Sequence, residues 1–169
     1  MVITILPLEG IQWDNQNILL GSTKKDVEAK LGKPEIVRNS YYYFKSELRF
    51  DFSKNDELES IEFLSGHNGD IQPVIYGVKA FQVSADELYN ILEEHNSGNL
   101  IDCENGYSFA FPNIGIGIFR ESTPDDVTDM VKEMQELGID TTDNPNVAEE
   151  QLKASYWATI SLASANYAW

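Results

Sequence analysis

The stretch 20–34 constrains the fold more than any other part of the sequence, because it marks both ends of one short helix. Thr23 is a favourable N-cap, and Asp26 stands where the acid of a capping box can reach back to the backbone N–H of the cap. Gly32 can take the left-handed conformation that ends a helix, and Pro34 prevents the helix from continuing. The stretch therefore predicts a helix whose start and end are set by local chemistry.

Three segments rich in aromatic and β-branched residues follow the helix, at residues 36–45, 47–52 and 57–64. Short polar breaks separate them, which is typical of strands joined by tight turns. In the second segment the apolar residues alternate with Arg49 and Asp51, so the apolar side chains should share one face and these two charged side chains the other. The prediction is one helix packed on a three-stranded antiparallel meander.

The same order of elements recurs in the second half of the chain. Residues 84–88 repeat the spacing seen at the start of the first helix. Three strands are expected after them, at residues 99–104, 107–111 and 114–119. This recurrence predicts two tandem units, residues 1–66 with an N-terminal strand and residues 74–121, joined by a loop of turn residues. Because capped helices and alternating strands are common, a chance match is the alternative to a structural duplication.

The last part of the chain, residues 122–169, predicts a helix and a strand. Its segment 122–126 supplies a capping residue, a proline for the first turn and two carboxylates, and Gly138 stops the helix. A polar loop and a short helix come next, and the alternating segment 156–162 is expected to form an edge strand. The whole chain is thus expected to be a single α+β domain of tandem helix-then-three-stranded antiparallel β units, with a C-terminal helix and edge strand.

Acidic side chains outnumber basic ones by 28 to 12, which gives a formal net charge of −16. This excess disfavours nucleic acid or an anionic membrane as the partner, because like charges repel. It favours a basic protein instead. The alternative is that the charge serves only solubility.

Few residues of the kinds used in catalysis or metal binding are present. The two histidines, His67 in a loop and His95 near a helix end, are too few for a histidine-rich metal site. Cys103 lies in a strand-like segment with no nearby basic residue to activate its thiol, so we expect it to be a buried apolar residue. We therefore expect no catalytic residue, metal ligand or cofactor. A hydrolase that uses carboxylates near His67 and Asp70 is one further alternative.

Cysteine usage and the N-terminal sequence indicate the compartment. A single cysteine cannot form a disulfide within the chain, and the first residues lack the basic leader and apolar run of an export signal. We therefore expect a cytoplasmic protein. No apolar stretch is long enough to span a bilayer.

The candidate partner-binding residues are two groups of carboxylates and a pair of aromatic residues. The carboxylates are expected on the solvent side of the first sheet and of the helix after Pro124, with the tyrosines as aromatic anchors. The set comprises Asp51, Glu59, Glu62, Tyr41 and Tyr43 of the sheet, and Asp125, Asp126, Asp129 and Glu133 of the helix. An ordinary solvated surface over buried tyrosines is the alternative. The aromatic segment 167–169 is expected to dock on the protein, since exposed aromatic side chains would reduce solubility.

The motif between Gly21 and Pro34, Gly-x-Thr-x-x-x-Val followed by Leu-Gly-x-Pro, resembles the signature of BamE-like domains, which are small modules of a helix on an antiparallel sheet. The resemblance implies the fold module alone, because the export signal and lipidated cysteine of those envelope proteins are missing here. As a whole the chain is acidic, aromatic-rich and free of catalytic motifs. In this it is similar in type to the immunity proteins that bacteria keep against polymorphic or contact-dependent toxins, which are often basic nucleases.

These similarities imply a binding or inhibitor protein rather than an enzyme, one that neutralises a basic toxin by occluding its active site. The alternative is a non-catalytic structural or assembly adaptor built on a duplicated BamE-like module, whose partner need not be basic. In either case we expect a protein partner and neither nucleic acid nor membrane.

Overall fold

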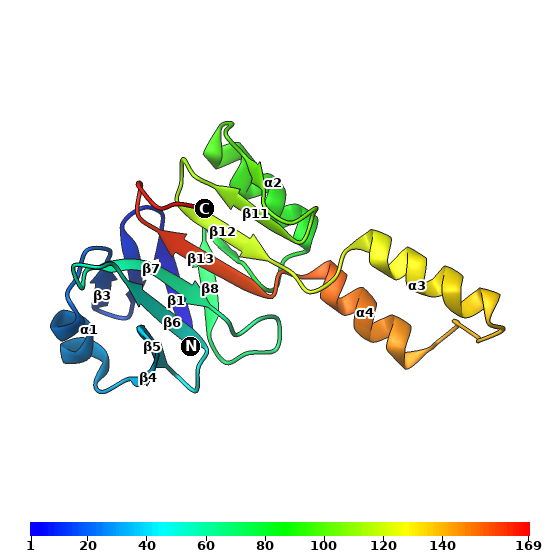
Figure 1. The fold of residues 1–169 in the computed structure, drawn as a ribbon, viewed down its shortest axis with the longest axis horizontal. Helices are drawn as coiled ribbons and strands as arrows, with labels where there is room; N and C mark the ends of the chain where they lie inside the picture. Colours follow the sequence, from blue (N-terminus) through cyan, green and yellow to red (C-terminus); the bar gives the residue numbers. More distant parts are fainter.

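A computed structural model describes all residues, 1–169, and shows an α+β fold with two sheets and four helices (Figure 1). The helices are α1 (Lys24–Leu31), α2 (Ala85–Asn96), α3 (Pro124–Glu136) and α4 (Pro145–Ser155). The smaller sheet has the strand order β3 (Gln16–Leu19), β2 (Gly10–Trp13), β1 (Val2–Leu6), β8 (Gln72–Ile75) and β9 (Val78–Lys79). The α+β class predicted from the sequence is confirmed.

The larger sheet is antiparallel throughout and consists of two halves with the same order of elements. In the first half, α1 is followed by β4 (Glu35–Val37), β5 (Ser40–Tyr43), β6 (Leu48–Phe52) and β7 (Leu58–Phe63). In the second half, α2 is followed by β10 (Ile101–Asp102), β11 (Ser108–Phe111), β12 (Ile116–Phe119) and β13 (Thr159–Ala163). The halves meet where β7 pairs with β13. Each half is therefore a helix and four strands, one strand more than was predicted for each unit. The three strands predicted in the second unit are present as β10, β11 and β12.

Two segments account for this difference. Residues 36–45, predicted as one strand, belong to the hairpin of β4 and β5, because the chain turns at Arg38, whose φ is +57°. A left-handed arginine is uncommon, so the sequence marks this turn only weakly. The predicted edge strand forms β13, which lies in the centre of the sheet and not at its edge.

Local signals predicted the helix ends correctly. Thr23 accepts a hydrogen bond from the N–H of Asp26, and the Asp26 carboxylate accepts one from the N–H of Thr23, which completes the capping box of α1. Gly32 follows the helix with a φ of +83°. At α2, Ser84 accepts a hydrogen bond from the N–H of Glu87. These ends need no tertiary contact to be specified.

One apolar core of 28 buried residues joins the two sheets with α1 and α2. The large sheet contributes aromatic residues from its inner face, among them Phe50, Phe63 and Phe111. The small sheet contributes mainly isoleucines, and α2 contributes Leu88 and Leu92. The inner face of the large sheet is thus covered, and its outer face is left for polar residues.

The helices α3 and α4 form a hairpin inserted between β12 and β13, here called the arm (residues 124–155). Figure 1 shows the two helices side by side, extending away from both sheets. Among the residues of these helices, only Val127 and Ala154 are buried. The corresponding connection between β6 and β7 is the short turn 53–57, and the turn predicted from the sequence covers residues 53–56. None of the four helices combines the length and the apolar character needed to cross a membrane.

Candidate partner-binding surface

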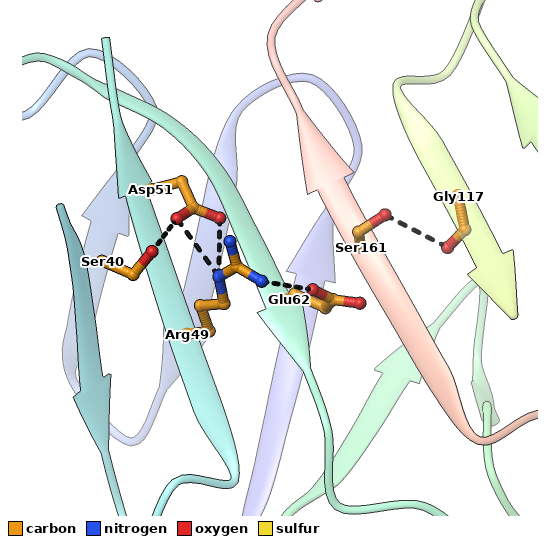
Figure 2. A network of polar contacts seen from close by, with 6 residues as sticks. All are labelled: Ser40, Arg49, Asp51, Glu62, Gly117 and Ser161. Carbon is orange, nitrogen blue, oxygen red and sulfur yellow. Dashed lines mark hydrogen bonds and ion pairs between the residues drawn. The ribbon is translucent and has the colours of Figure 1, made fainter. Parts of the chain in front are cut away.

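The outer face of the large sheet carries a polar row across four strands. Strand pairing places Arg49 of β6 beside Glu62 of β7, Glu62 beside Ser161 of β13, and Ser161 beside Gly117 of β12. Directly paired residues on neighbouring strands project from the same face. The row therefore forms one continuous surface that crosses from the first half of the sheet to the second, as Figure 2 shows.

Arg49 is the centre of an ion-pair network on this face (Figure 2). Its Nε lies 3.0 Å from Oδ2 of Asp51, and its Nη1 lies 3.9 Å from Oε2 of Glu62. From the neighbouring strand, the hydroxyl of Ser40 donates a hydrogen bond to Asp51. One guanidinium thus faces two carboxylates, so the network keeps a net negative charge.

A groove with a volume of about 330 Å³ lies on this face, next to the segment that follows β13. Tyr167 and Trp169 of that segment line the groove together with Asp51 and Glu62. Gly117 permits the close approach, because a Cβ atom at this position would lie 2.6 Å from an atom of the Trp169 ring. The groove therefore combines aromatic walls with carboxylates.

The electrostatics of the groove follow from partial burial and the excess of carboxylates. Burial raises the pKa of Glu62, and the charge of Arg49 offsets part of this rise. Burial also raises the pKa of the Tyr167 hydroxyl, and the carboxylates of Asp51, Glu59 and Glu62 raise it further. Tyr167 thus lies within the field of three carboxylates.

The three carboxylates predicted on the sheet are therefore brought together, but the predicted aromatic anchors are wrong. Tyr41 and Tyr43 are each 7% exposed and belong to the core. Their pairing with Phe50 and Leu48 places them on the inner face of the sheet. Their rings therefore cannot contact a partner on the outer face.

The four carboxylates predicted on the helix after Pro124 lie on the arm and not in the groove. Three of them are exposed and form no ion pair or side-chain hydrogen bond, namely Asp125, Asp129 and Glu133. Asp126 has a different role, because its carboxylate accepts hydrogen bonds from the N–H of Thr123 and the hydroxyl of Tyr107. The hydrogen bond from Tyr107 lowers the pKa of Asp126. Asp126 is therefore a helix cap and not a free partner-binding carboxylate, contrary to the prediction.

The histidines make contacts within the fold. The Nδ1 atom of His67 lies 2.9 Å from the carbonyl oxygen of Phe81, and no hydrogen bond or ion pair joins His67 to Asp70. His95 stacks on Tyr76 with ring centroids 3.6 Å apart. The geometry gives no support to a hydrolytic pair at His67 and Asp70.

Cys103 is exposed and lines the groove, so the prediction that it is buried was wrong. The N–H of Cys103 donates a hydrogen bond to the carbonyl oxygen of Ser108, another groove residue, so Cys103 lies beside the groove and not in the core. Its exposed position adds a small polar group to the groove wall.

Only Asp51 and Glu62 of the groove residues were among the predicted site residues, and the charged and aromatic residues that were missed include Arg49, Tyr167 and Trp169. The sequence did place Arg49 on the outer face, and it indicated that the segment 167–169 docks on the protein. The place where this segment docks depends on the space above Gly117, which no local pattern reveals.

Comparisons with protein-family models, curated proteins and solved structures give no match to this chain.

Proposed function

We propose that this chain is an inhibitor that binds a basic protein and blocks it, as a bacterial immunity protein does with its toxin. The observation that carries the proposal is the groove on the outer face of the large sheet. There Asp51 and Glu62 line the groove with Tyr167, and Arg49 is the only basic residue in the lining. Glu59 does not line the groove, but its charge acts on Tyr167 together with those of Asp51 and Glu62.

A lysine or arginine side chain of a partner suits this groove for two reasons. The carboxylates of Asp51 and Glu62 can pair with its charge, and partial burial strengthens such pairs relative to pairs in open solvent. The rings of Tyr167 and Trp169 offer π faces that attract cations. In a basic nuclease, a cationic side chain held in this way is no longer available to bind phosphate, which accounts for inhibition.

The charge of the whole molecule supports the same proposal. A net charge of −16 attracts a basic protein over a long range and raises the rate at which the two meet. Salt screens this attraction, so association should slow as the ionic strength rises. A cytoplasmic location, where an immunity protein meets its toxin, is part of the proposal.

The test uses the protein encoded by the gene immediately upstream, because immunity genes normally follow their toxin genes. We expect it to bind the purified chain at low salt and to bind more weakly at moderate salt. The triple variant Asp51→Asn, Glu59→Gln, Glu62→Gln should bind at least about tenfold more weakly, because close charge pairs across an interface are lost.

The control is the triple variant Glu9→Gln, Glu93→Gln, Glu94→Gln, which makes the same change in net charge at exposed positions outside the groove. Circular dichroism should show that both variants are folded. The proposal fails if the upstream protein does not bind, or if the control weakens binding as much as the groove variant does. Binding that is insensitive to salt would favour an adaptor instead.

A further inference from the structure

The arm is larger than the connection between its two strands requires. It joins β12 to β13, whereas the turn 53–57 joins β6 to β7 at the corresponding place in the first half of the sheet. That turn shows that a few residues are enough to connect two neighbouring antiparallel strands. The arm therefore serves some purpose other than closing the sheet.

The base of the arm is firmly attached to the body. The guanidinium of Arg120 lies over the ring of Trp157 at 4.8 Å and donates hydrogen bonds to the carbonyl oxygens of Gly106 and Ala154. Trp157 in turn donates a hydrogen bond to the carbonyl oxygen of Ala85, at the start of α2, with a distance of 2.8 Å. The arm therefore leaves the body from a fixed point.

The tip of the arm exposes apolar side chains in a defined conformation. Leu137 is 77% exposed and Ile139 is 45% exposed. Between them Gly138 has a φ of +73°, and the N–H of Ile139 donates a hydrogen bond to the carbonyl oxygen of Met134 at 2.9 Å. This bond is the mark of a Schellman motif, a regular way to end a helix. The two apolar side chains are thus presented to solvent by an ordered turn.

Carboxylates surround the apolar tip. Residues 124–155 contain nine aspartates or glutamates and two lysines, a formal charge of −7. Four of the carboxylates lie on either side of the tip, at Glu133, Glu136, Asp140 and Asp143. Two arms of this charge repel each other, which disfavours a second copy of the tip as the occupant. The complementary surface is an apolar pocket with lysine or arginine at its rim.

We propose that the arm is a docking element whose tip, Leu137 and Ile139, inserts into an apolar pocket rimmed by basic residues on the protein partner. This inference rests on the proposed function, because it assigns a second contact with the same basic partner. It goes further in naming the chemistry of the pocket. The groove holds a cationic side chain, and the arm reaches a separate site on the partner.

The test is the double variant Leu137→Ser, Ile139→Ser, measured for binding to the protein encoded by the upstream gene. Both side chains are exposed, so the variant should fold as the wild type does. We expect binding to weaken by about tenfold to a hundredfold, because buried apolar anchors dominate interface energetics. The matched control is Ile36→Ser, Val37→Ser on β4, which replaces two apolar residues that are 56% and 50% exposed and lie outside the arm.

Each outcome bears on the inference in a distinct way. If the wild type binds the upstream protein and the tip variant binds equally well, the docking role is wrong and the proposed function stands. If the control weakens binding as much as the tip variant does, the tip has no special role, and the inference fails. If the wild type does not bind the upstream protein, both proposals fail. If sedimentation shows a wild-type dimer that the tip variant lacks, the occupant is a second copy, and the inference is overturned.

Discussion

The two halves of the large sheet have the same order of a helix and four strands, yet they differ in how their last two strands are connected. In the first half, a short turn joins β6 to β7. In the second half, the 32-residue arm joins β12 to β13 and leaves most of its surface in solvent. Since the first half folds without such an insertion, the arm adds a surface and not a necessary part of the core.

This difference separates the part of the chain that builds the core from the part that we propose for binding. Most of the buried residues lie in the sheets, α1 and α2, whereas the helices of the arm bury only Val127 and Ala154. Burial of apolar area is the main favourable term in folding. Changes in the body should therefore affect unfolding, and changes in the arm should affect binding.

The largest effect is expected at Trp157, which ties the base of the arm to the body. Trp157 is 1% exposed, and its indole N–H donates to Ala85. The substitution Trp157→Ala leaves a cavity and removes this hydrogen bond, and should lower the free energy of unfolding by about 3–5 kcal/mol. Urea denaturation followed by circular dichroism measures this loss.

Trp157→Phe is the matched variant, because it keeps an aromatic ring and loses the hydrogen bond. Its free energy of unfolding should lie between that of Trp157→Ala and that of the wild type. If Trp157→Ala lowers the free energy of unfolding by less than about 1 kcal/mol, the stability of the second half of the sheet does not depend on the contacts of Trp157.

The second largest effect concerns hydrogen exchange in the arm. Amides in the distal part of the arm, near the tip, should exchange at least about a hundredfold faster than amides of β7 and β13, after correction for intrinsic rates. The reason is that no residue of α3 and α4 beyond Val127 and Ala154 is buried, whereas β7 and β13 lie in the centre of the sheet. Exchange measured by mass spectrometry on the free protein checks this.

The amides of α2 are the internal control, because α2 is also a helix but packs on the core through Leu88 and Leu92. They should exchange more slowly than those of the arm. If the amides of the arm are protected from exchange as strongly as those of α2, the arm unfolds together with the body. The stability of the arm would then not differ from that of the body.

The smallest effect is a pH dependence from Glu62 on the outer face. Burial raises the pKa of Glu62 in the folded state, so the folded protein binds the proton more tightly than the unfolded chain does. The contribution of Glu62 to stability is therefore fully present below its unfolded pKa and is lost as the pH rises through the folded pKa. As the pH rises from the ordinary pKa of glutamate through the raised pKa of the folded state, the stability of the wild type should fall relative to that of Glu62→Gln.

Urea denaturation at several pH values measures this difference. The variant Glu94→Gln corrects for the change in net charge, because it removes one carboxylate from an exposed position on α2. A constant difference between the wild type and Glu62→Gln across this range would show that the sheet does not perturb Glu62.

The elements that the sequence predicted are those with local signals. The capping box of Thr23 and Asp26 and the alternation around Arg49 and Asp51 specify a helix start and a strand face without distant contacts. The position of β13 could not be predicted in this way. Its alternation indicates a strand, but its pairing with β7 is a contact between distant parts of the chain.

The candidate site shows the same division between local and distant information. Asp51 was placed on the outer face because polar and apolar residues alternate in β6. The run of tyrosines in β5 has no such alternation, so the sequence does not determine on which face of the sheet Tyr41 and Tyr43 lie. The pairing of β5 with β6 determines it. Asp126 was misassigned although it stands three residues after Thr123, which is the capping-box spacing of Thr23 and Asp26. Only its hydrogen bond from Tyr107 depends on a distant contact.

The central pairing of β7 with β13 has a consequence for synthesis of the protein. The ribosome completes β7 at Phe63 but does not reach β13 until Thr159, so β8 to α4 are all made in the interval. Throughout that time the nascent chain has an unpaired edge along β7, and such edges can recruit strands from other molecules. Glu59 and Glu62 interrupt the apolar residues of β7 and place negative charge along this unpaired strand. We therefore expect these two carboxylates to disfavour aggregation of the unfinished protein.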